Sequence, residues 1–234
     1  MNRRRTHGFT LVETAIVLVI IGLLLGGLLK AAELINSARL RSLIAQQDEV
    51  KVAFFGFEER FRAVPGDYIL AKANIRGATE NGNGNGRIEI TATPTETILA
   101  WEHLSRAGFL IGTYTYNATE SAATSPVNPY GVYRQIAYDG IYGAGTTGIP
   151  SVLRHNIKTG SQIPVAFLAE MDRKIDDGAP NLGGFQFSRY QGSNGLAAPT
   201  DGSTTAPACT SATIDSGIWN ATNDSANCGG ASLL

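Results

Sequence analysis

The segment from Phe9 to Leu29 constrains the fold of this chain more than any other part of the sequence. It is almost entirely apolar, and its one charged residue is Glu13. A helix of about 20 apolar residues spans the hydrocarbon core of a bilayer and satisfies its own backbone hydrogen bonds there. The segment therefore predicts a membrane-spanning helix, in which a carboxylate is costly unless it gains a partner or lies near the interface.

The residues before this helix form a short basic leader. Arg3, Arg4 and Arg5 predict that the leader stays in the cytoplasm and that the rest of the chain is exported. An ordinary secretory signal peptide is one alternative, but its apolar region has only about 7–15 residues and ends at a small-residue cleavage site. Here the apolar run is longer, and residues 30–33 make a poor cleavage site. A plain, uncleaved signal anchor is the second alternative.

The junction between leader and helix carries a specific motif. Gly8 is followed by Phe9, and Glu13 comes four residues after that phenylalanine, at the start of the apolar helix. This Gly-Phe-Thr-Leu-Val-Glu sequence resembles the type III signal of type IV pilins and pseudopilins. The resemblance implies that a membrane-embedded prepilin peptidase cuts between Gly8 and Phe9 and methylates the new amino group of Phe9.

The resemblance implies a physical role for Glu13 in filament assembly. In a filament of staggered helices, its carboxylate can pair with the Phe9 amine of a neighbouring subunit. Such a pair offsets the cost of burying either charge alone in a dry core. We therefore expect the loss of Glu13 to impair filament assembly more than it impairs folding of the exported region.

The resemblance implies a structural subunit and no enzyme: a major pilin, a minor pilin or a secretion pseudopilin. Its partners would be other pilin subunits, the prepilin peptidase, and the pilus or type II secretion assembly machinery. The precursor would cross the bacterial inner membrane once with its C-terminal domain outside the cytoplasm, before joining an extracellular or periplasmic filament. The rival interpretation is an uncleaved membrane anchor that carries an extracytoplasmic ligand-binding module.

The helix is predicted to continue beyond the membrane. Residues 31–62 contain no proline, and an apolar stripe recurs there at helical spacing. The stripe consists of Val50, Phe54, Phe57 and Phe61. Val64-Pro65-Gly66 predicts the end of this helix. The pilin resemblance then implies an α+β fold, with a long N-terminal helix packed on an antiparallel β-sheet and short extra helices.

These expectations divide the chain into four parts. They are a leader peptide (1–8), a transmembrane and assembly helix (9–29), an amphipathic continuation (30–64), and an extracytoplasmic α+β globular region (65–234). Within the globular region, Thr93–Glu96 is a capping box with proline at the first helical position, which predicts a helix up to Gly108. A second helix is predicted within 164–177, and strands within 130–138 and 185–190.

The two cysteines, Cys209 and Cys228, both lie in the region predicted to be exported. An even number of cysteines outside the cytoplasm predicts one disulfide, and two unpaired thiols are the alternative. The pair would close a C-terminal loop similar to that of many pilins. Neither cysteine belongs to a Cys-x-x-Cys motif or has a histidine beside it, which argues against zinc and redox chemistry.

A loop of three Asn-Gly pairs offers the candidate metal site. The side chains of Asn81, Asn83, Asn85 and Glu89, with Gly86 at the sixth position, are similar to the start of an EF-hand calcium loop. The first three are neutral amides, however, and Ala92 stands where that loop has glutamate. A plain Asn-Gly turn is therefore the main interpretation, and weak calcium binding is the alternative. No other cofactor is predicted.

Two further acidic or glycine-rich patterns have ordinary explanations. Asp172, Asp176 and Asp177 could ligate a cation, but a charged helix C-terminus followed by an Asp-Gly turn is the main interpretation. Residues 143–148 read GxGxxG, but Ile149-Pro150 follows in place of the helix that a dinucleotide site requires.

No catalytic set assembles from the sequence. His7, His103 and His155 are far apart, and the chain contains no HExxH, GxSxG or P-loop motif. Loss of the leader removes three arginines and no acidic residue, which leaves a weakly acidic chain. Such a chain has no overall electrostatic attraction to nucleic acid.

Overall fold

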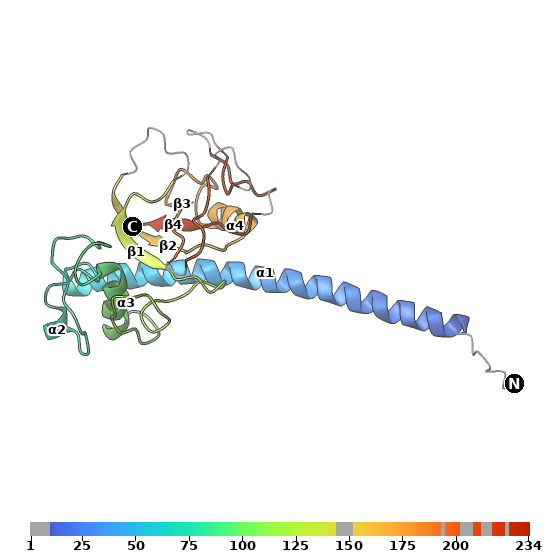
Figure 1. Cartoon of the computed structure of the whole chain (residues 1–234), viewed down its shortest axis with the longest axis horizontal. Coiled ribbons are helices and arrows are strands. Elements are labelled where there is room, and N and C mark those ends of the chain that lie inside the picture. The colour runs from blue at the N-terminus through green and yellow to red at the C-terminus, as the bar shows by residue number, and fades with distance from the viewer. Residues whose placement is uncertain (1–9, 144–151, 193–194, 202–207, 212–216, 223–224) are drawn as a thin grey trace. The chain divides into compact units, whose positions relative to one another are not determined.

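The computed structural model describes residues 10–143, 152–192, 195–201, 208–211, 217–222 and 225–234. The chain divides into two compact units, Met1–Arg41 and Ser42–Leu234. Helix α1 (Leu11–Phe61) supplies the described part of the first unit and the beginning of the second (Figure 1).

The first unit exposes large apolar side chains along α1. Leu11 is 89 % exposed and Leu29 is 76 % exposed. Among the residues that the structure describes, α1 is the one helix long and apolar enough to cross a membrane. Such exposure is unfavourable in water, so this part of the helix needs a bilayer or other helices around it.

The part of α1 in the second unit is amphipathic, as its sequence predicts. Val50, Phe54 and Phe57 are buried, and Phe61 packs against the same cluster. Their ring and aliphatic surfaces meet Ile136 and other apolar side chains of the globular region. The predicted stripe is therefore the side of α1 on which the core forms.

The helix ends three residues before the predicted Val64–Gly66 stop. Its last residue is Phe61, and Arg62 follows in the left-handed backbone region at φ 53°. The amide of Arg62 still donates to the carbonyl of Glu58 at 2.8 Å. A left-handed residue just after the last turn is a common way for helices to end.

Four short strands form one antiparallel sheet in the order β1-β2-β4-β3 (Figure 1). Strand β1 (Gln135–Asp139) pairs with β2 (Arg154–Lys158), with Ile136 opposite Ile157. Strand β4 (Gly230–Leu233) lies between β2 and β3 (Phe185–Phe187). The antiparallel sheet and the long helix confirm the predicted α+β class.

Three shorter helices complete the described elements. They are α2 (Ala71–Asn74), α3 (Glu96–Arg106) and α4 (Val165–Ile175). Helix α3 buries Trp101 and Leu104 in the same cluster as the stripe of α1. Helix α4 buries Leu168 and Met171. The helices predicted after Thr93 and within 164–177 are therefore present.

The predicted capping box of α3 is wrong. The helix begins at Glu96, so Thr95 rather than Thr93 is the N-cap residue, and it makes no side-chain cap hydrogen bond. The Glu96 carboxylate instead accepts the backbone N–H groups of Asn83 and Glu89, at 3.1 and 3.0 Å. The carboxylate that the box would have used thus binds the loop 7–13 residues earlier in the chain.

Arg134 joins three parts of the core. Its guanidinium donates to the carbonyl of Gln46 on α1 at 2.9 Å and lies 6.0 Å from the ring centroid of Trp101 on α3. Burial lowers the pKa of Arg134 to about 10, an effect that the nearby Glu49 opposes. The residue remains a cation at neutral pH and binds α1 to the chain just before β1.

Replacing Phe57 with alanine should lower the free energy of unfolding of the second unit by about 3–5 kcal/mol. The ring is fully buried and lies within 4.6–6.2 Å, between centroids, of Phe61, Tyr68, His103 and Phe109. Urea unfolding of the full chain in detergent measures the loss. Phe55→Ala is the matched control, because the Phe55 ring is 52 % exposed and its loss should cost about 1 kcal/mol or less. Equal losses for the two variants would contradict this account of the core.

Candidate assembly and ligand sites

Glu13 closes a capping box at the start of α1. The amide of Glu13 donates to Thr10 Oγ1 at 3.2 Å, and the amide of Thr10 donates to Glu13 Oε2 at 3.1 Å. These two bonds satisfy donors that a helix N-terminus leaves without intrahelical partners. The Thr-x-x-Glu spacing was present in the sequence, where Glu13 was interpreted only as a partner for an amine.

The cap holds the Glu13 carboxylate at the positive end of the helix dipole. The Thr10 hydroxyl also donates to Oε2, at 3.1 Å, so the amide and the hydroxyl of Thr10 both use the same carboxylate oxygen. A carboxylate offers about four lone-pair positions on its two oxygens. Glu13 can therefore cap its own helix and also accept a further donor. Gly8 and Phe9 lie outside the described residues, and their cleavage and methylation stay predictions.

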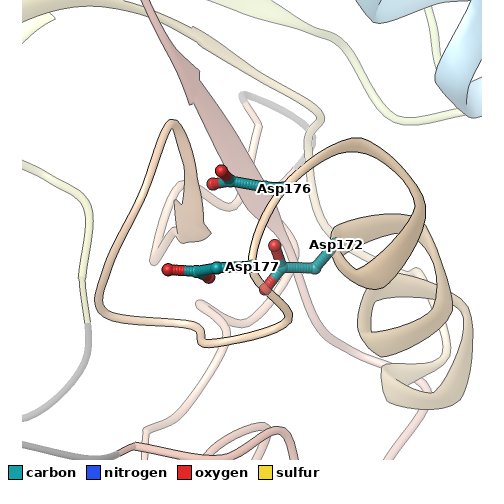
Figure 2. Close-up of side chains that lie close together, drawn as sticks. All are labelled: Asp172, Asp176 and Asp177. Atoms are coloured by element: carbon teal, nitrogen blue, oxygen red, sulfur yellow. The ribbon is translucent and has the colours of Figure 1, made fainter.

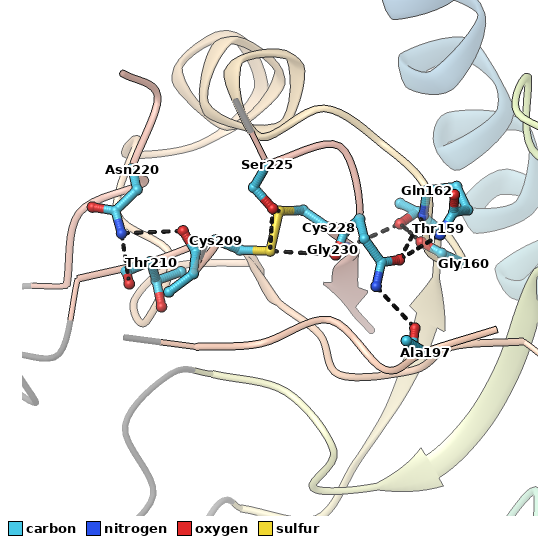
Figure 3. Close-up of a disulfide and its surroundings, with 12 residues drawn as sticks. Thr159, Gly160, Gln162, Ala197, Cys209, Thr210, Asn220, Ser225, Cys228 and Gly230 are labelled. Atoms are coloured by element: carbon cyan, nitrogen blue, oxygen red, sulfur yellow. Dashed lines mark hydrogen bonds between the residues drawn. A yellow bond between two sulfur atoms is a disulfide. The ribbon is translucent and has the colours of Figure 1, made fainter. Parts of the chain in front are cut away.

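Cys209 and Cys228 form the predicted disulfide, with their Cα atoms 5.7 Å apart (Figure 3). Both residues are fully buried. Cys228 pairs through its backbone with Ile163, at 3.1 and 3.0 Å, just before α4. The disulfide thus holds the C-terminal segment beside α4. Its two cysteines are 19 residues apart in the sequence, so the bond also closes a loop that restricts the unfolded chain.

The Asn-Gly loop is folded around the carboxylate of Asp67, which is 3 % exposed. Asp67 Oδ1 accepts the amides of Gly84 and Asn85 at 2.6 and 3.0 Å, and Oδ2 accepts the amide of Gly86 at 2.7 Å. A Cβ atom at Gly82 would lie 2.2 Å from the carbonyl carbon of Asp67, so the backbones meet too closely for any other residue. Sequence reasoning missed Asp67, because its partners lie 17–19 residues further along the chain.

The four residues predicted as calcium ligands form hydrogen bonds within the loop and to the start of α2. Asn81 Oδ1 accepts the amide of Lys72 at 2.8 Å. Asn83 and Asn85 each accept the amide two residues ahead, at 3.0 and 2.9 Å. The Asn85 side chain donates to Glu89 Oε2 at 2.8 Å. The chain's own hydrogen bonds close the turn, and calcium binding by these residues stays a prediction.

A second buried carboxylate, Glu102 on α3, holds two more irregular segments. It accepts the amide and hydroxyl of Thr79 at 3.0–3.1 Å, and the amide of Tyr116 at 3.1 Å. Glu96, six residues earlier, serves the Asn-Gly loop in the same way. Burial raises the pKa of Glu96, and the amides of Glu89 and Asn83 oppose that rise. These acids act as acceptors for loop backbone, a role that needs no substrate.

Of the two described histidines, His103 is buried and His155 is half-buried. His103 is fully buried, accepts the amide of Gly66 at Nδ1 (2.9 Å) and has Nε2 3.2 Å from the carbonyl of Glu80. Burial lowers its pKa, which favours a neutral ring that donates from Nε2. His155 packs between Phe54 and Tyr138, and burial lowers its pKa to about 4. Their surroundings explain His103 as a hydrogen-bonding group and His155 as a packing group.

The acidic cluster lies where α4 ends (Figure 2). Asp172 Oδ2 accepts the indole N–H of Trp219 at 2.7 Å, and Asp176 Oδ2 accepts the amide of Phe185 at 2.7 Å. Asp177 Oδ1 accepts the amide of Ala179 at 2.8 Å. Burial raises the pKa of Asp172 to about 6. The three aspartates therefore form a charged helix end followed by a turn. Their hydrogen bonds connect the end of α4 to β3 and to the disulfide-bonded segment.

Of the GxGxxG residues 143–148, all but Gly143 lie outside the described residues.

Comparison with known families gives a match to the N-terminal part of the chain. The family model described as a prokaryotic N-terminal methylation motif matches residues 3–29. These residues include the arginine leader, the Gly8–Phe9 junction, Glu13 and the apolar half of α1. No curated protein and no solved structure matches the chain. The chain therefore carries a type IV pilin-like prepilin signal at its N-terminus, and that signal agrees with the apolar helix and the α+β fold that follow it.

His155 should make the second unit less stable as the pH falls. Its pKa is about 4 in the folded chain and near 6.5 when unfolded, so its contribution is complete above pH 6.5 and is lost between pH 6.5 and 4. His155→Phe keeps an aromatic ring and removes the titration. Relative to this variant, the wild type should lose about 1 kcal/mol between pH 7 and pH 5, allowing for partial solvent exposure.

Urea unfolding of both proteins at each pH measures this difference. The wild type must be compared with His155→Phe because Asp172 changes stability in the opposite direction. The raised pKa of Asp172 makes the folded chain gain stability as the pH falls towards 4. Asp172 is present in both proteins, so its effect cancels. Parallel stability curves for the wild type and His155→Phe would show that His155 is not held neutral by the fold.

Proposed function

We propose that this protein is a structural subunit of a type IV pilus-like filament, as a major pilin, a minor pilin or a secretion pseudopilin. It is made as a precursor in the bacterial inner membrane, cut between Gly8 and Phe9 by a prepilin peptidase, and methylated on Phe9. The observation that carries this proposal is the match of residues 3–29, which include Glu13, to the methylation motif.

The chemistry of assembly follows from Glu13 and the helix around it. The apolar side chains of the first unit are exposed and need neighbours of the same kind. When subunit helices pack with a stagger, the methylated amine of one subunit approaches the Glu13 carboxylate of another. The cap already fixes that carboxylate through Thr10, so little side-chain freedom is lost when the pair forms.

The second unit is the exported part of the subunit. The three leader arginines favour a cytoplasmic N-terminus, which places residues after the membrane helix outside the cytoplasm. The buried disulfide between Cys209 and Cys228 suits an oxidising compartment. After assembly these units would cover an extracellular or periplasmic filament, whose other partners are further pilin subunits and the assembly machinery of a pilus or type II secretion system.

Mass spectrometry of the purified wild-type protein should find N-methylated Phe9 as its first residue. Gly8→Leu should retain the whole leader, because the resemblance places the peptidase's recognition at this glycine. Cells that lack prepilin peptidase provide the control and should yield only the precursor. A wild-type protein that keeps Arg3–Arg5 in cells with the peptidase would instead support an uncleaved anchor for a ligand-binding module.

Glu13→Ala should leave cleavage and the exported fold intact and should abolish incorporation of the subunit into filaments, or reduce it about tenfold or more. The variant leaves the neighbour's amine without its carboxylate in an apolar core. Immunoblotting of sheared filaments against total protein measures incorporation. Glu33→Ala is the matched control: Glu33 lies on the same helix and pairs with Lys30 at 2.6 Å on an exposed surface. Unchanged incorporation of Glu13→Ala would sink the assembly role of this residue.

A further inference from the structure

The three Asn-Gly pairs in residues 81–86 contain a reactive arrangement of atoms. In such a pair, the backbone nitrogen of glycine can attack the side-chain carbonyl carbon of asparagine. A C–N bond forms, the side-chain amide leaves as ammonia, and a five-membered succinimide results. Water then opens the ring at either carbonyl and leaves aspartate or isoaspartate. Glycine is the most permissive second residue, because it lacks a Cβ atom that would hinder the approach.

The attacking nitrogen must first lose its proton, and in this structure all three glycine N–H groups are held. Gly84 donates to Asp67 Oδ1 at 2.6 Å, and Gly86 donates to Asp67 Oδ2 at 2.7 Å. Gly82 donates to the carbonyl oxygen of Tyr68 at 3.1 Å. Two of the three possible nucleophiles therefore lie directly against one carboxylate that is almost completely buried.

A carboxylate in this position opposes the reaction. Deprotonation of Gly84 or Gly86 would create a second negative charge less than 3 Å from the first, in a site shielded from water. A carboxylate is also far too weak a base to remove the proton from a peptide N–H group. We infer that Asp67 protects Asn83 and Asn85 from spontaneous deamidation, and that this loop becomes a site of chemical modification when the Asp67 carboxylate is lost.

The asparagine side chains are restrained as well. Asn83 Oδ1 accepts the amide of Asn85, and Asn85 Oδ1 accepts the amide of Arg87. These bonds direct each side-chain carbonyl towards the nitrogen two residues ahead, while the attack requires the nitrogen of the next residue. Deamidation would also place new carboxylates close to Glu89 and Glu96, and isoaspartate would lengthen the backbone by one carbon. The loop would then lose the turn that Asp67 organises. This inference does not rest on the proposed function.

Peptide mapping tests the inference on the full chain in detergent micelles. Wild type and Asp67→Asn are kept at pH 8, below their unfolding temperatures, and then digested with trypsin. Cleavage after Arg76 and Arg87 releases the peptide 77–87, which contains all three pairs. Mass spectrometry with chromatographic separation of aspartate and isoaspartate gives the rate at each site. Asp67→Asn should raise the rates at Asn83 and Asn85 about tenfold or more.

Glu96→Gln is the matched control. Glu96 holds the same loop, but through the amides of Asn83 and Glu89 rather than through a glycine amide. In Glu96→Gln, Asn83 and Asn85 should therefore deamidate at nearly the wild-type rate. Wild-type rates in a folded Asp67→Asn protein would overturn the inference, as would equal acceleration in Glu96→Gln. If Asp67→Asn does not fold, the folded wild type is compared with the wild type unfolded in urea. Equal deamidation rates at Asn83 and Asn85 in the folded and unfolded protein would overturn the inference.

Discussion

The globular unit depends on the burial of one side of α1. Phe54 and Phe57 expose 2 % and 0 % of their surfaces, and burying a side chain of this size contributes about 1.5–3 kcal/mol. The same cluster receives Trp101 from α3, Ile136 from β1 and Ile157 from β2. None of these short elements could bury its apolar surface alone. The helix therefore provides the surface on which the short strands and helices become stable.

Irregular backbone around this core creates a second requirement. The segment between α1 and α3 has only the four-residue helix α2, so many of its N–H groups cannot bond within regular structure. Buried carboxylates meet that need: Asp67, Glu96 and Glu102 each accept two or more N–H or O–H groups. Burying a carboxylate is costly, but charge-assisted hydrogen bonds offset the cost when the acceptor is well satisfied. Polar side chains thus organise the loops, while α1 organises the core.

Sequence periodicity predicted those parts of the fold that local pattern controls. The Val50–Phe61 stripe identified the buried side of α1, and proline and glycine located the ends of α1 and α4 within a few residues. Strand β4, Gly-Ala-Ser-Leu, has no alternating pattern and becomes a strand only by pairing with β2 and β3. Asp67 and Glu96 could not be assigned from sequence, because their partners are separated from them by loops. At the N-terminus the motif was local, so residues 3–29 were recognisable without any structure.

The capping geometry at Glu13 separates two reasons for an acidic residue at this position. A glutamine could accept the Thr10 amide nearly as well, because capping boxes use glutamate or glutamine at this place. The helix dipole adds some preference for a charge, worth about 0.3–1 kcal/mol at an exposed terminus. That preference is smaller than the cost of a carboxylate within an apolar assembly. Capping therefore explains where the side chain points but does not explain its charge. A cationic partner explains the charge, and the amine released by cleavage after Gly8 is the partner that the proposed function supplies.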